Sequence, residues 1–379
     1  MENKRILIVG STSASLINFR GDFIKSLVKN GFEVFAAAPE FDKKTYDQLI
    51  DYGATPIEFK LQRTGMNPIK DAKTILELKK IISNNNIDLV FPYTVKPVIY
   101  GSIAAKLCKV SVISLITGLG FAFTGLTLKA RVLQRLNEFL YKISIRKNKV
   151  IVFQNSDDYN LFLKRRIIKK KNKVEFVNGS GVNLDKYRYR INNNMSDNIS
   201  FLFIARLIQE KGIGLYIDAA EVLKKKYPNA IFHVIGYVDE SPSAIKLEKL
   251  NALHTEGIII YHGPQKNIAD HLYKRDVFVL PTYYREGVPR SILEALSVGL
   301  PIITTNTPGC KETVKKDKNG FLIKPQNLEE LITAMEYFIT NKAKIKEMGI
   351  HSRKYAEEKF DVDIINNKLI SIVKSALRH

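Results

Sequence analysis

The chain has 379 residues, which is enough for two domains of ordinary size, each with its own hydrophobic core. Hydrophobic residues make up 45% of it and charged residues 26%, values typical of a globular protein. Its two cysteines, Cys108 and Cys310, exclude a disulfide framework and favour a reducing compartment. The formal net charge of +21 indicates an anionic partner.

Strands alternate with helical segments along the chain, which predicts an α/β protein with parallel sheets. The strands predicted in the first half are Arg5–Val9, Val34–Ala38, Leu89–Tyr93, Val110–Ile116, Val150–Gln154 and Val174–Val177. Those predicted in the second half are Phe201–Ala205, Ile231–Ile235, Ile258–Tyr261, Val277–Leu280 and Ile302–Thr304. The asparagine-rich segment 192–198 between them is the predicted linker. We therefore predict domains over residues 1–190 and 191–360, followed by a terminal helix over 361–379.

The first strand is followed by the segment 10–20, which contains several small residues, and a helix is predicted to start near Asn18. Small side chains there would let a diphosphate or an acceptor approach the backbone. The candidate residues are Ser13, Ala14 and Ser15. Thr117 and Gly118 follow another strand and are candidates for the same acceptor or phosphate loop. The first apolar run is too short for a signal sequence, so we expect no export.

The positive charge is concentrated in the first half. Residues 1–190 carry 33 Lys and Arg against 16 Asp and Glu, or +17, and the remainder carries 26 against 22, or +4. Basic and apolar residues interleave near helical spacing after residue 128, which predicts a basic amphipathic helix suited to anionic lipid headgroups. Its candidate membrane residues are Lys129, Arg131, Arg135, Lys142 and Arg146. Its apolar residues are Val132, Leu133, Leu136, Leu140, Ile143 and Ile145.

Two alternatives remain for this region. The charge run is compatible with an ordinary solvated helix face, and nucleic acid is a rival polyanion, although no nucleic-acid recognition motif is present. The uncharged stretch 110–128 is long enough to suggest a membrane-spanning helix, but its glycines, serines and threonines favour a strand followed by a loop. The apolar loop 121–128 could enter a membrane, hold a polyprenyl chain, or simply be buried.

In the second half, Arg206 and Lys211 bracket a short loop at the end of a predicted strand. Ligands of open α/β sheets bind at that edge. An arginine fork beside a lysine point charge suits a diphosphate, whose charge grows as it leaves. We therefore expect Arg206 and Lys211 to bind a diphosphate.

The segment 285–296 is the most informative part of the chain. It predicts a loop carrying Glu286 and a helix with Pro289 in its first turn and Glu294 about one turn further in. Unpaired amides around Gly287–Ser291 suit a phosphate group. The carboxylates beside them could accept hydrogen bonds from sugar hydroxyls, so the combination favours a sugar phosphate ester. An acidic first turn of a helix is the plainer alternative.

Two further strand ends complete the predicted donor site. Tyr237 follows one strand and could stack on a base, and Pro264 follows the next. We expect His262, beside Pro264, to be structural. Asp361 and Asp363 form a D-x-D, but they open the terminal helix, so we expect capping and metal-independent chemistry.

The Arg206/Lys211 pair and the Glu286-x7-Glu294 spacing resemble the family-4 retaining glycosyltransferases of the GT-B fold. The segments 11–20, 118–120 and 179–183 resemble the bacterial branch that extends undecaprenyl-diphosphate-linked oligosaccharides, in particular N-acetylgalactosaminyltransferases. The resemblance implies two Rossmann-like domains facing a cleft, with the terminal helix crossing back to the first. Many members carry a donor-contacting histidine where this chain has Thr117.

The resemblance also assigns roles. It implies that Glu286 contacts the donor sugar, Glu294 the nucleotide ribose, and the amides of Gly287 and Val288 the phosphate or sugar. The expected catalytic residues are Arg206, Lys211 and Glu286. The expected donor-binding residues are Gly287, Val288, Pro289, Glu294, Tyr237 and Pro264.

The expected function follows from this resemblance. It is transfer of an N-acetylhexosamine or related hexose from a UDP-sugar, with retention and without a metal, to an undecaprenyl-diphosphate-linked saccharide. The enzyme would be cytoplasmic and peripheral on the inner face of the membrane, with no nucleic acid partner. The alternatives are a UDP-sugar epimerase or phosphorylase of the same fold and a non-enzymatic polyanion-binding module.

Overall fold

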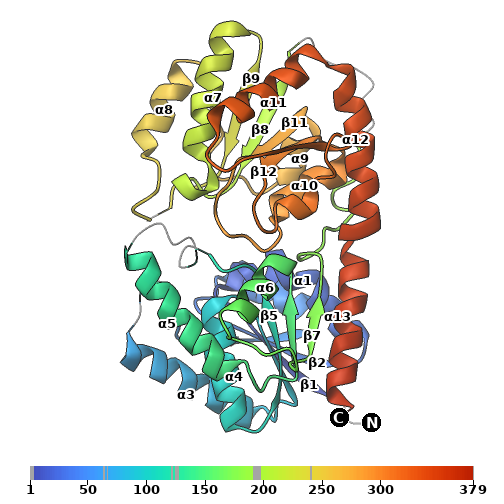
Figure 1. Cartoon of the computed structure of the whole chain (residues 1–379). Coiled ribbons are helices and arrows are strands. Elements are labelled where there is room, and N and C mark those ends of the chain that lie inside the picture. Colours follow the sequence, from blue (N-terminus) through green and yellow to red (C-terminus); the bar gives the residue numbers. More distant parts are fainter. Residues whose placement is uncertain are drawn as a thin grey trace. The chain divides into compact units, whose positions relative to one another are not determined.

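The computed structural model describes residues 4–62, 65, 67–120, 123, 128–190, 198–239 and 241–378, without the side chains of 128–131. The chain divides into two compact units (Figure 1). Unit 1 comprises residues 1–180 and 363–379, and unit 2 comprises residues 181–362. The first boundary therefore lies earlier than the predicted one at residue 190. The reason is that Val182 pairs with Asp361, and the hydroxyl of Tyr187 donates to Glu294, within unit 2.

Unit 1 contains a parallel sheet of seven strands in the order β3-β2-β1-β4-β5-β6-β7. Its strands are β1 Arg5–Val9, β2 Glu33–Ala38, β3 Ala54–Glu58, β4 Leu89–Pro92, β5 Ser111–Ile116, β6 Val150–Phe153 and β7 Val174–Phe176. Its helices are α1 Ser13–Lys29, α2 Lys43–Asp51, α3 Pro68–Asn84, α4 Val95–Leu107, α5 Leu128–Ser144, α6 Ser156–Lys164 and α13 Val362–Leu377.

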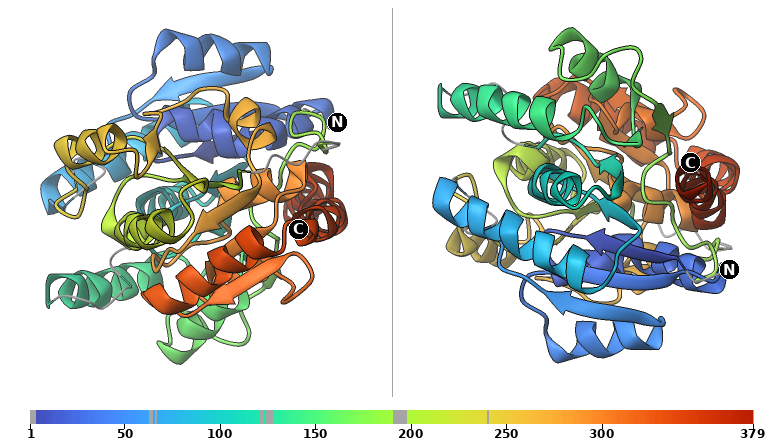
Figure 2. Two further views of the ribbon diagram at one scale, coloured as in Figure 1. Left: turned by 90° about the horizontal axis from the view of Figure 1, so that it is seen from above. Right: turned by 90° about the horizontal axis from the view of Figure 1, so that it is seen from below.

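Helices cover both faces of this sheet because successive strand residues point to opposite sides. Ile6 and Ile8 of β1 pack with α1, α2 and α13, whereas Leu7 and Val9 pack with α3, α4, α5 and α6. The terminal helix α13 thus returns to unit 1, as predicted, and buries Leu369 and Val373 there. Helices α3, α4 and α5 lie side by side (Figure 2, right).

Unit 2 contains a parallel sheet of six strands in the order β10-β9-β8-β11-β12-β13. Its strands are β8 Ser200–Ile204, β9 Ile231–Ile235, β10 Ile260–Tyr261, β11 Val277–Leu280, β12 Ile302–Thr305 and β13 Gly320–Ile323. Its α-helices are α7 Ile213–Lys226, α8 Leu247–Thr255, α9 Ile268–Tyr273, α10 Arg290–Val298, α11 Leu328–Thr340 and α12 Ala343–Tyr355. Short turns of other helix types are η2 Gln209–Lys211, η3 Lys311–Thr313 and η4 Ala356–Phe360.

The predicted strands are all present, with ends shifted by at most a few residues, but two edge strands were not predicted. Strand β3 contains Pro56, which normally argues against a strand. An edge strand tolerates proline because one side of it has no hydrogen-bonding neighbour. Strand β13 is also an edge strand and opens with Gly320, a residue that weakens the strand pattern.

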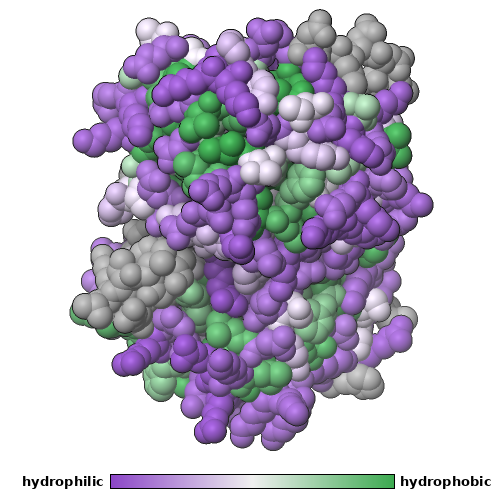
Figure 3. Space-filling model, turned by 45° about the horizontal axis from the view of Figure 1, so that its top comes forward, coloured by the Kyte–Doolittle hydropathy of each residue, from purple (hydrophilic) through white to green (hydrophobic). Residues whose placement is uncertain are grey.

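The uncharged stretch forms β5 and then a turn, which confirms the predicted strand. No helix within the described ranges is long and apolar enough to cross a membrane. Of the predicted apolar loop, residues 121, 122 and 124–127 lie outside the description, whereas Phe123 is buried. The face drawn in Figure 3 is mostly hydrophilic, with hydrophobic residues in separate patches.

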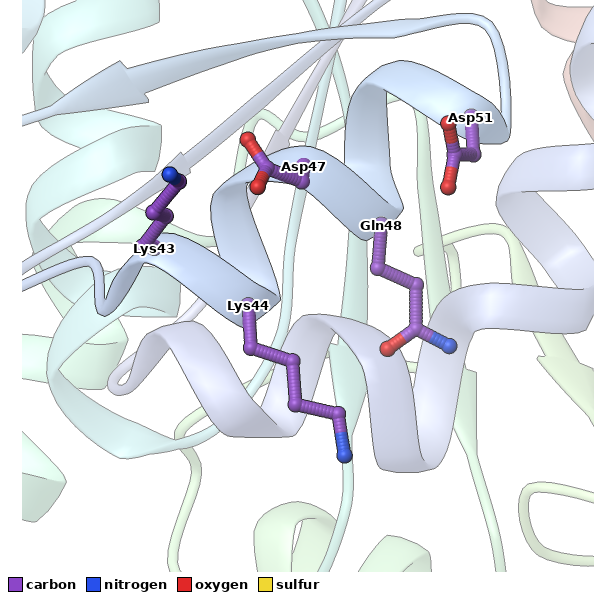
Figure 4. A pocket seen from close by; sticks show the side chains of 5 residues that line it. All are labelled: Lys43, Lys44, Asp47, Gln48 and Asp51. Atoms are coloured by element: carbon purple, nitrogen blue, oxygen red, sulfur yellow. The ribbon is translucent and has the colours of Figure 1, made fainter.

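A shallow hollow beside α2 carries charges of both signs (Figure 4). It is lined by Lys43, Lys44, Asp47, Gln48 and Asp51, all from one helix. Most of these side chains are exposed, and none of the predicted site residues lies there. We assign no function to it.

Candidate functional site

Strand order in unit 2 brings the two predicted motifs together. The chain leaves β8 toward β9 and β10 on one side of the sheet and later returns to β11 on the other, so β8 and β11 are neighbours. Arg206 follows β8 and Glu286 follows β11, at the carboxyl ends of both strands. This is the topological switch point at which open α/β sheets bind ligands.

A single carbonyl group holds these two loops against each other. The carbonyl of Glu210 accepts hydrogen bonds from the hydroxyl of Thr282 at 2.9 Å and from the amides of Tyr283 at 2.9 Å and Tyr284 at 3.0 Å. The buried Glu210 carboxylate accepts a hydrogen bond from the Ser243 hydroxyl at 2.6 Å. Glu210 was not predicted as a site residue, because its contacts lie on loops distant in the sequence.

The two predicted cations flank one aromatic ring. The ring centroid of Tyr284 lies 5.7 Å from the guanidinium carbon of Arg206 and 5.1 Å from Nζ of Lys211. Arg206 Nη1 donates to Asp239 Oδ2 at 3.1 Å, and Lys211 Nζ pairs with Glu286 Oε1. Burial lowers the pKa of Arg206, but nearby Tyr284, Tyr237 and Asp239 outweigh it and raise that pKa, so the charge is permanent.

The loop before α10 presents backbone amides, as predicted. The N–H groups of Gly287 and Val288 donate to no acceptor among the described residues. Pro289 was predicted to lie in the first turn of the helix. Instead, it is the N-cap, and α10 begins at Arg290. Gly309 packs so closely on the Gly287 carbonyl that a side chain there would overlap it, and its φ of +80° also favours glycine.

Glu294 is buried and partly engaged. Its Oε1 accepts hydrogen bonds from the Tyr187 hydroxyl and from Arg290 Nε, both at 2.9 Å. Oε2 accepts none from any residue that the structure describes. Burial and the neighbouring Glu294 raise the pKa of Tyr187, so its phenol stays a hydrogen-bond donor. Tyr187 lies 107 positions away in the sequence, so nothing local predicts this contact.

The predicted base-binding residues also follow neighbouring strands. Tyr237 follows β9 and is 48% exposed, and Pro264 follows β10. The amide of Gly236 donates to the Gly263 carbonyl at 3.1 Å and joins the two strand ends. The ring of His262 contacts His233, with Nε2 and Nδ1 3.0 Å apart.

Burial lowers the pKa of His233 to about 3 and that of His262 to about 4, so both rings are neutral near pH 7. His271 packs edge-on against His262. His262 thus packs against two other histidine rings, which fits the structural role expected for it.

In unit 1 the predicted acceptor residues Ser13, Ala14 and Ser15 lie in a helix, not on a loop. Helix α1 begins at Ser13, because Thr12 caps it by accepting from the Ser15 amide. The prediction of a start near Asn18 was therefore wrong. The Ser13 hydroxyl donates to the Glu40 carbonyl at 2.7 Å, and Ser15 Oγ lies 2.7 Å from the Tyr93 hydroxyl.

The remaining unit 1 candidates lie at the same edge of the sheet. Ala14 is exposed in the first turn of α1. Thr117 and Gly118 follow β5, and Gly118 adopts a φ of +100°. The site residues of units 1 and 2 thus each lie at the carboxyl ends of parallel strands.

The predicted amphipathic helix is α5. Its exposed apolar side chains are Val132 (66%), Leu136 (39%), Phe139 (57%) and Ile143 (47%). These four positions are three or four residues apart and form one helix face. Arg135 and Lys142 are exposed within the same stretch, whereas the Lys129 and Arg131 side chains lie outside the description.

Three other predicted surface residues point inward. Ile145 is buried, and Leu133 and Leu140 are half-buried. The prediction that Arg146 contacts lipid was wrong. Instead, its guanidinium donates to the carbonyls of Ile167 at 3.1 Å and Arg166 at 2.8 Å. An arginine used in this way holds the loop after α6.

Within the described part of the chain, no three His, Cys, Asp or Glu side chains are grouped to hold a metal ion. Asp361 immediately precedes α13, and Asp363 lies in its first turn. Both positions are typical of carboxylates at a helix N-terminus.

Comparison with known proteins gives the class. Residues 185–355 match the family described as "Glycosyl transferases group 1", and residues 5–155 match "Glycosyl transferase 4-like". A glycosyltransferase from Rickettsia africae superposes with a TM-score of 0.80 at 18% identity, covering all of both chains. The Anabaena protein HepE, solved with UDP and glucose, superposes with a TM-score of 0.78 at 17% identity over 98% of this chain and 100% of its own. The chain therefore has the GT-B fold of two-domain glycosyltransferases.

The sequence relatives are more specific. The N,N'-diacetylbacillosaminyl-diphospho-undecaprenol α-1,3-N-acetylgalactosaminyltransferase of Campylobacter jejuni is 31% identical over 339 residues, 86% of this chain and 87% of that one. The Escherichia coli UDP-Gal:α-D-GlcNAc-diphosphoundecaprenol α-1,3-galactosyltransferase is 28% identical, covering 70% of each chain. The chain belongs to the family-4 glycosyltransferases, and it is an enzyme that transfers a sugar.

Proposed function

We propose that the protein transfers an N-acetylhexosamine or related hexose from a UDP-sugar to a saccharide carried on undecaprenyl diphosphate, with retention of the anomeric configuration. The observation that carries the donor half is the set of unused polar groups at the switch point. Arg206 uses only Nη1 toward described residues, Glu294 keeps Oε2, and the amides of Gly287 and Val288 donate to nothing described.

Each of these groups matches a part of a nucleotide sugar. The remaining guanidinium edge and the two amides are donors for diphosphate oxygens. Oε2 of Glu294 is an acceptor for ribose hydroxyls, and we assign Glu286, on the loop before α10, to the hexose. Tyr237 is exposed at the end of β9, where its ring can stack on a pyrimidine. We assign Pro264 to the same base-binding end.

We propose the following chemistry for this site. The bond between the sugar C1 and the diphosphate oxygen breaks, and the acceptor oxygen bonds to C1 on the same face. The acceptor's hydroxyl proton passes to the departing phosphate oxygen, and UDP leaves. Arg206 and Lys211 stabilise the negative charge that grows on that diphosphate. These cations supply charge stabilisation without a metal ion.

The acceptor half of the proposal is supported by the relatives and by α5. Both relatives described above are named for acceptors linked to undecaprenyl diphosphate. The exposed face of α5, defined as Val132, Leu136, Phe139 and Ile143 with Arg135 and Lys142, combines apolar and basic side chains. Such a face suits an anionic bilayer, in which the lipid end of the acceptor is embedded. The enzyme would then work peripherally at the inner face of the membrane.

The donor assignment is tested by calorimetry of UDP, GDP and their sugars with the full chain. The donor that binds is then assayed with a polyprenyl-diphosphate-linked N-acetylhexosamine, and the linkage of the product is read by NMR. We expect UDP to bind and an α-linked product to form from the α-linked donor. Preferential binding of GDP or a β-linked product would overturn the corresponding part.

The membrane assignment is tested by cosedimentation with phosphatidylglycerol vesicles. Replacing Arg135 and Lys142 with Gln should weaken binding about 30-fold, since each interfacial cation contributes about 1 kcal/mol. Binding should also weaken as salt rises. The control replaces Lys43 and Lys44 with Gln, because α2 covers the opposite face of the sheet and the net charge changes equally. Equal loss in both variants, or equal binding to neutral vesicles, would exclude α5 as the membrane surface.

A further inference from the structure

Backbone hydrogen bonds at Tyr237, Ser243 and Ile245 join the segment between β9 and α8 to the loop that carries Arg206 and Lys211. The amide of Leu207 donates to the Tyr237 carbonyl at 3.1 Å, and the amide of Gln209 donates to the Ser243 carbonyl at 2.9 Å. In the opposite direction, the amide of Ile245 donates to the Leu207 carbonyl at 3.0 Å. The two loops therefore behave as one unit, and a side chain on the first can be fixed relative to the second.

Asp239 is the acidic side chain that this arrangement places beside Arg206. Its Oδ1 accepts from the Ser241 amide at 2.9 Å, and its Oδ2 accepts from Arg206 Nη1 at 3.1 Å. Because its own loop fixes one oxygen, the other is aimed at the guanidinium. A carboxylate orients a metal-binding histidine in a similar way, by accepting a hydrogen bond from the ring nitrogen that does not bind the metal.

The guanidinium of Arg206 is held on two sides. Its Cζ lies over the Tyr284 ring, 5.7 Å from the ring centroid, and its Nη1 donates to Asp239 Oδ2. Its Nε and Nη2 groups donate to no residue in the described ranges. A guanidinium has five N–H donors in a rigid fork, so one edge can be fixed while another binds two oxygens of a phosphate.

We propose that Asp239 is a positioning residue that holds the Arg206 fork in register for the donor diphosphate. The inference rests on the proposed function of Arg206 as a diphosphate ligand. In this proposal the Asp239 carboxylate does not contact the donor. It acts by restricting the rotation of Arg206, so that the free edge already faces the oxygen on which negative charge grows.

A different role for Asp239, as a group that occupies the diphosphate position in the absence of donor, can be distinguished from positioning. If Asp239 occupied the place of the diphosphate, the donor would have to displace it, and removing the carboxylate would tighten nucleotide binding. As a positioning residue, it keeps its hydrogen bond to Nη1 in the donor complex. Its removal then lowers turnover and leaves the donor's KM nearly constant.

The experiment compares Asp239→Ala, Asp239→Asn and the control Glu248→Gln. Glu248 is exposed on α8, close along the chain, so its variant has the same charge change as Asp239→Asn without the contact. We expect Asp239→Ala to lower kcat about tenfold with less than a threefold change in KM, because the fork loses orientation in the transition state. Asp239→Asn should recover part of kcat, since its amide oxygen can still accept from Nη1.

A double-mutant cycle with Arg206 separates positioning from general loop stability. In an Arg206→Ala background, Asp239→Ala should change kcat by less than twofold. The same tenfold loss in both backgrounds, tighter UDP binding by Asp239→Ala, or unchanged kcat would each overturn the inference. Circular dichroism checks folding, and Asp239→Asn carries the test if the Ala variant does not fold. The cycle uses the donor selected by the nucleotide screen, so preference for GDP would reject the UDP proposal and leave the Asp239 result interpretable.

Discussion

Replacing Glu286 and Lys211 separately should change nucleotide affinity in opposite directions. The two side chains pair with each other in the structure. A diphosphate approaching Lys211 must therefore compete with the Glu286 carboxylate. Glu286→Gln removes that competitor, so UDP should bind more tightly, whereas Lys211→Met removes the cation, so UDP should bind more weakly.

The magnitude follows from the burial of the pair. The side chains of Lys211 and Glu286 are 13% and 14% exposed. Pairs on the surface contribute about 0–1 kcal/mol, and breaking a buried pair costs about 3–5 kcal/mol. An intermediate value of about 2 kcal/mol corresponds to about a 30-fold decrease in the UDP dissociation constant for Glu286→Gln. Turnover should nevertheless fall about 100-fold, since Glu286 is the proposed hexose contact.

Calorimetry with UDP measures the affinities, and initial rates with the sugar donor measure turnover. Glu248→Gln again serves as the control for net charge. Weaker UDP binding by Glu286→Gln would refute the competition and place this carboxylate on the nucleotide. Parental turnover in Lys211→Met would refute the diphosphate clamp.

Four further outcomes are expected. Glu294→Ala should weaken UDP binding about tenfold by calorimetry and should weaken uridine binding equally, because the proposed partner is the ribose; a loss confined to UDP would contradict that. Gly309→Ala should lower turnover at least tenfold by displacing Gly287, whereas Gly257→Ala, with a similar φ and open space around it, should not. Burial lowers the pKa of His233 to about 3. Below the unfolded value of about 6.5 the unfolded chain binds the extra proton, so His233 should lower the free energy of unfolding by about 2 kcal/mol between pH 6.5 and 5, and His262, whose pKa burial lowers to about 4, should add to this fall. Denaturant titrations should show this fall, and His233→Asn should reduce it. EDTA should leave the rate of sugar transfer within twofold of its original value, and a strict metal requirement would contradict the proposed charge stabilisation.

The sequence by itself determined the alternation of strands and helices and the local character of the site loops. A buried parallel strand is a short apolar run, and a loop with Arg206 and Lys211 or with Glu286 is visible wherever it follows such a run. The start of α10 was predicted within one residue because proline and the apolar period mark it locally. Edge strand β3 was missed because Pro56 gives the opposite local signal.

The tertiary structure alone decided which charged groups meet. Lys211 and Glu286 are 75 positions apart, and Tyr187 and Glu294 are 107 apart. Strand order brings the first pair together. After β10 the chain crosses back over β8, so β11 is added on the other side of β8 and becomes its neighbour. Arg146 was predicted to face lipid, yet its guanidinium donates to two carbonyls, and Asp239, which carries no local signal in the sequence, pairs with Arg206. Periodicity reports the face on which a residue lies, but partners distant in the chain depend on the packing of the whole sheet.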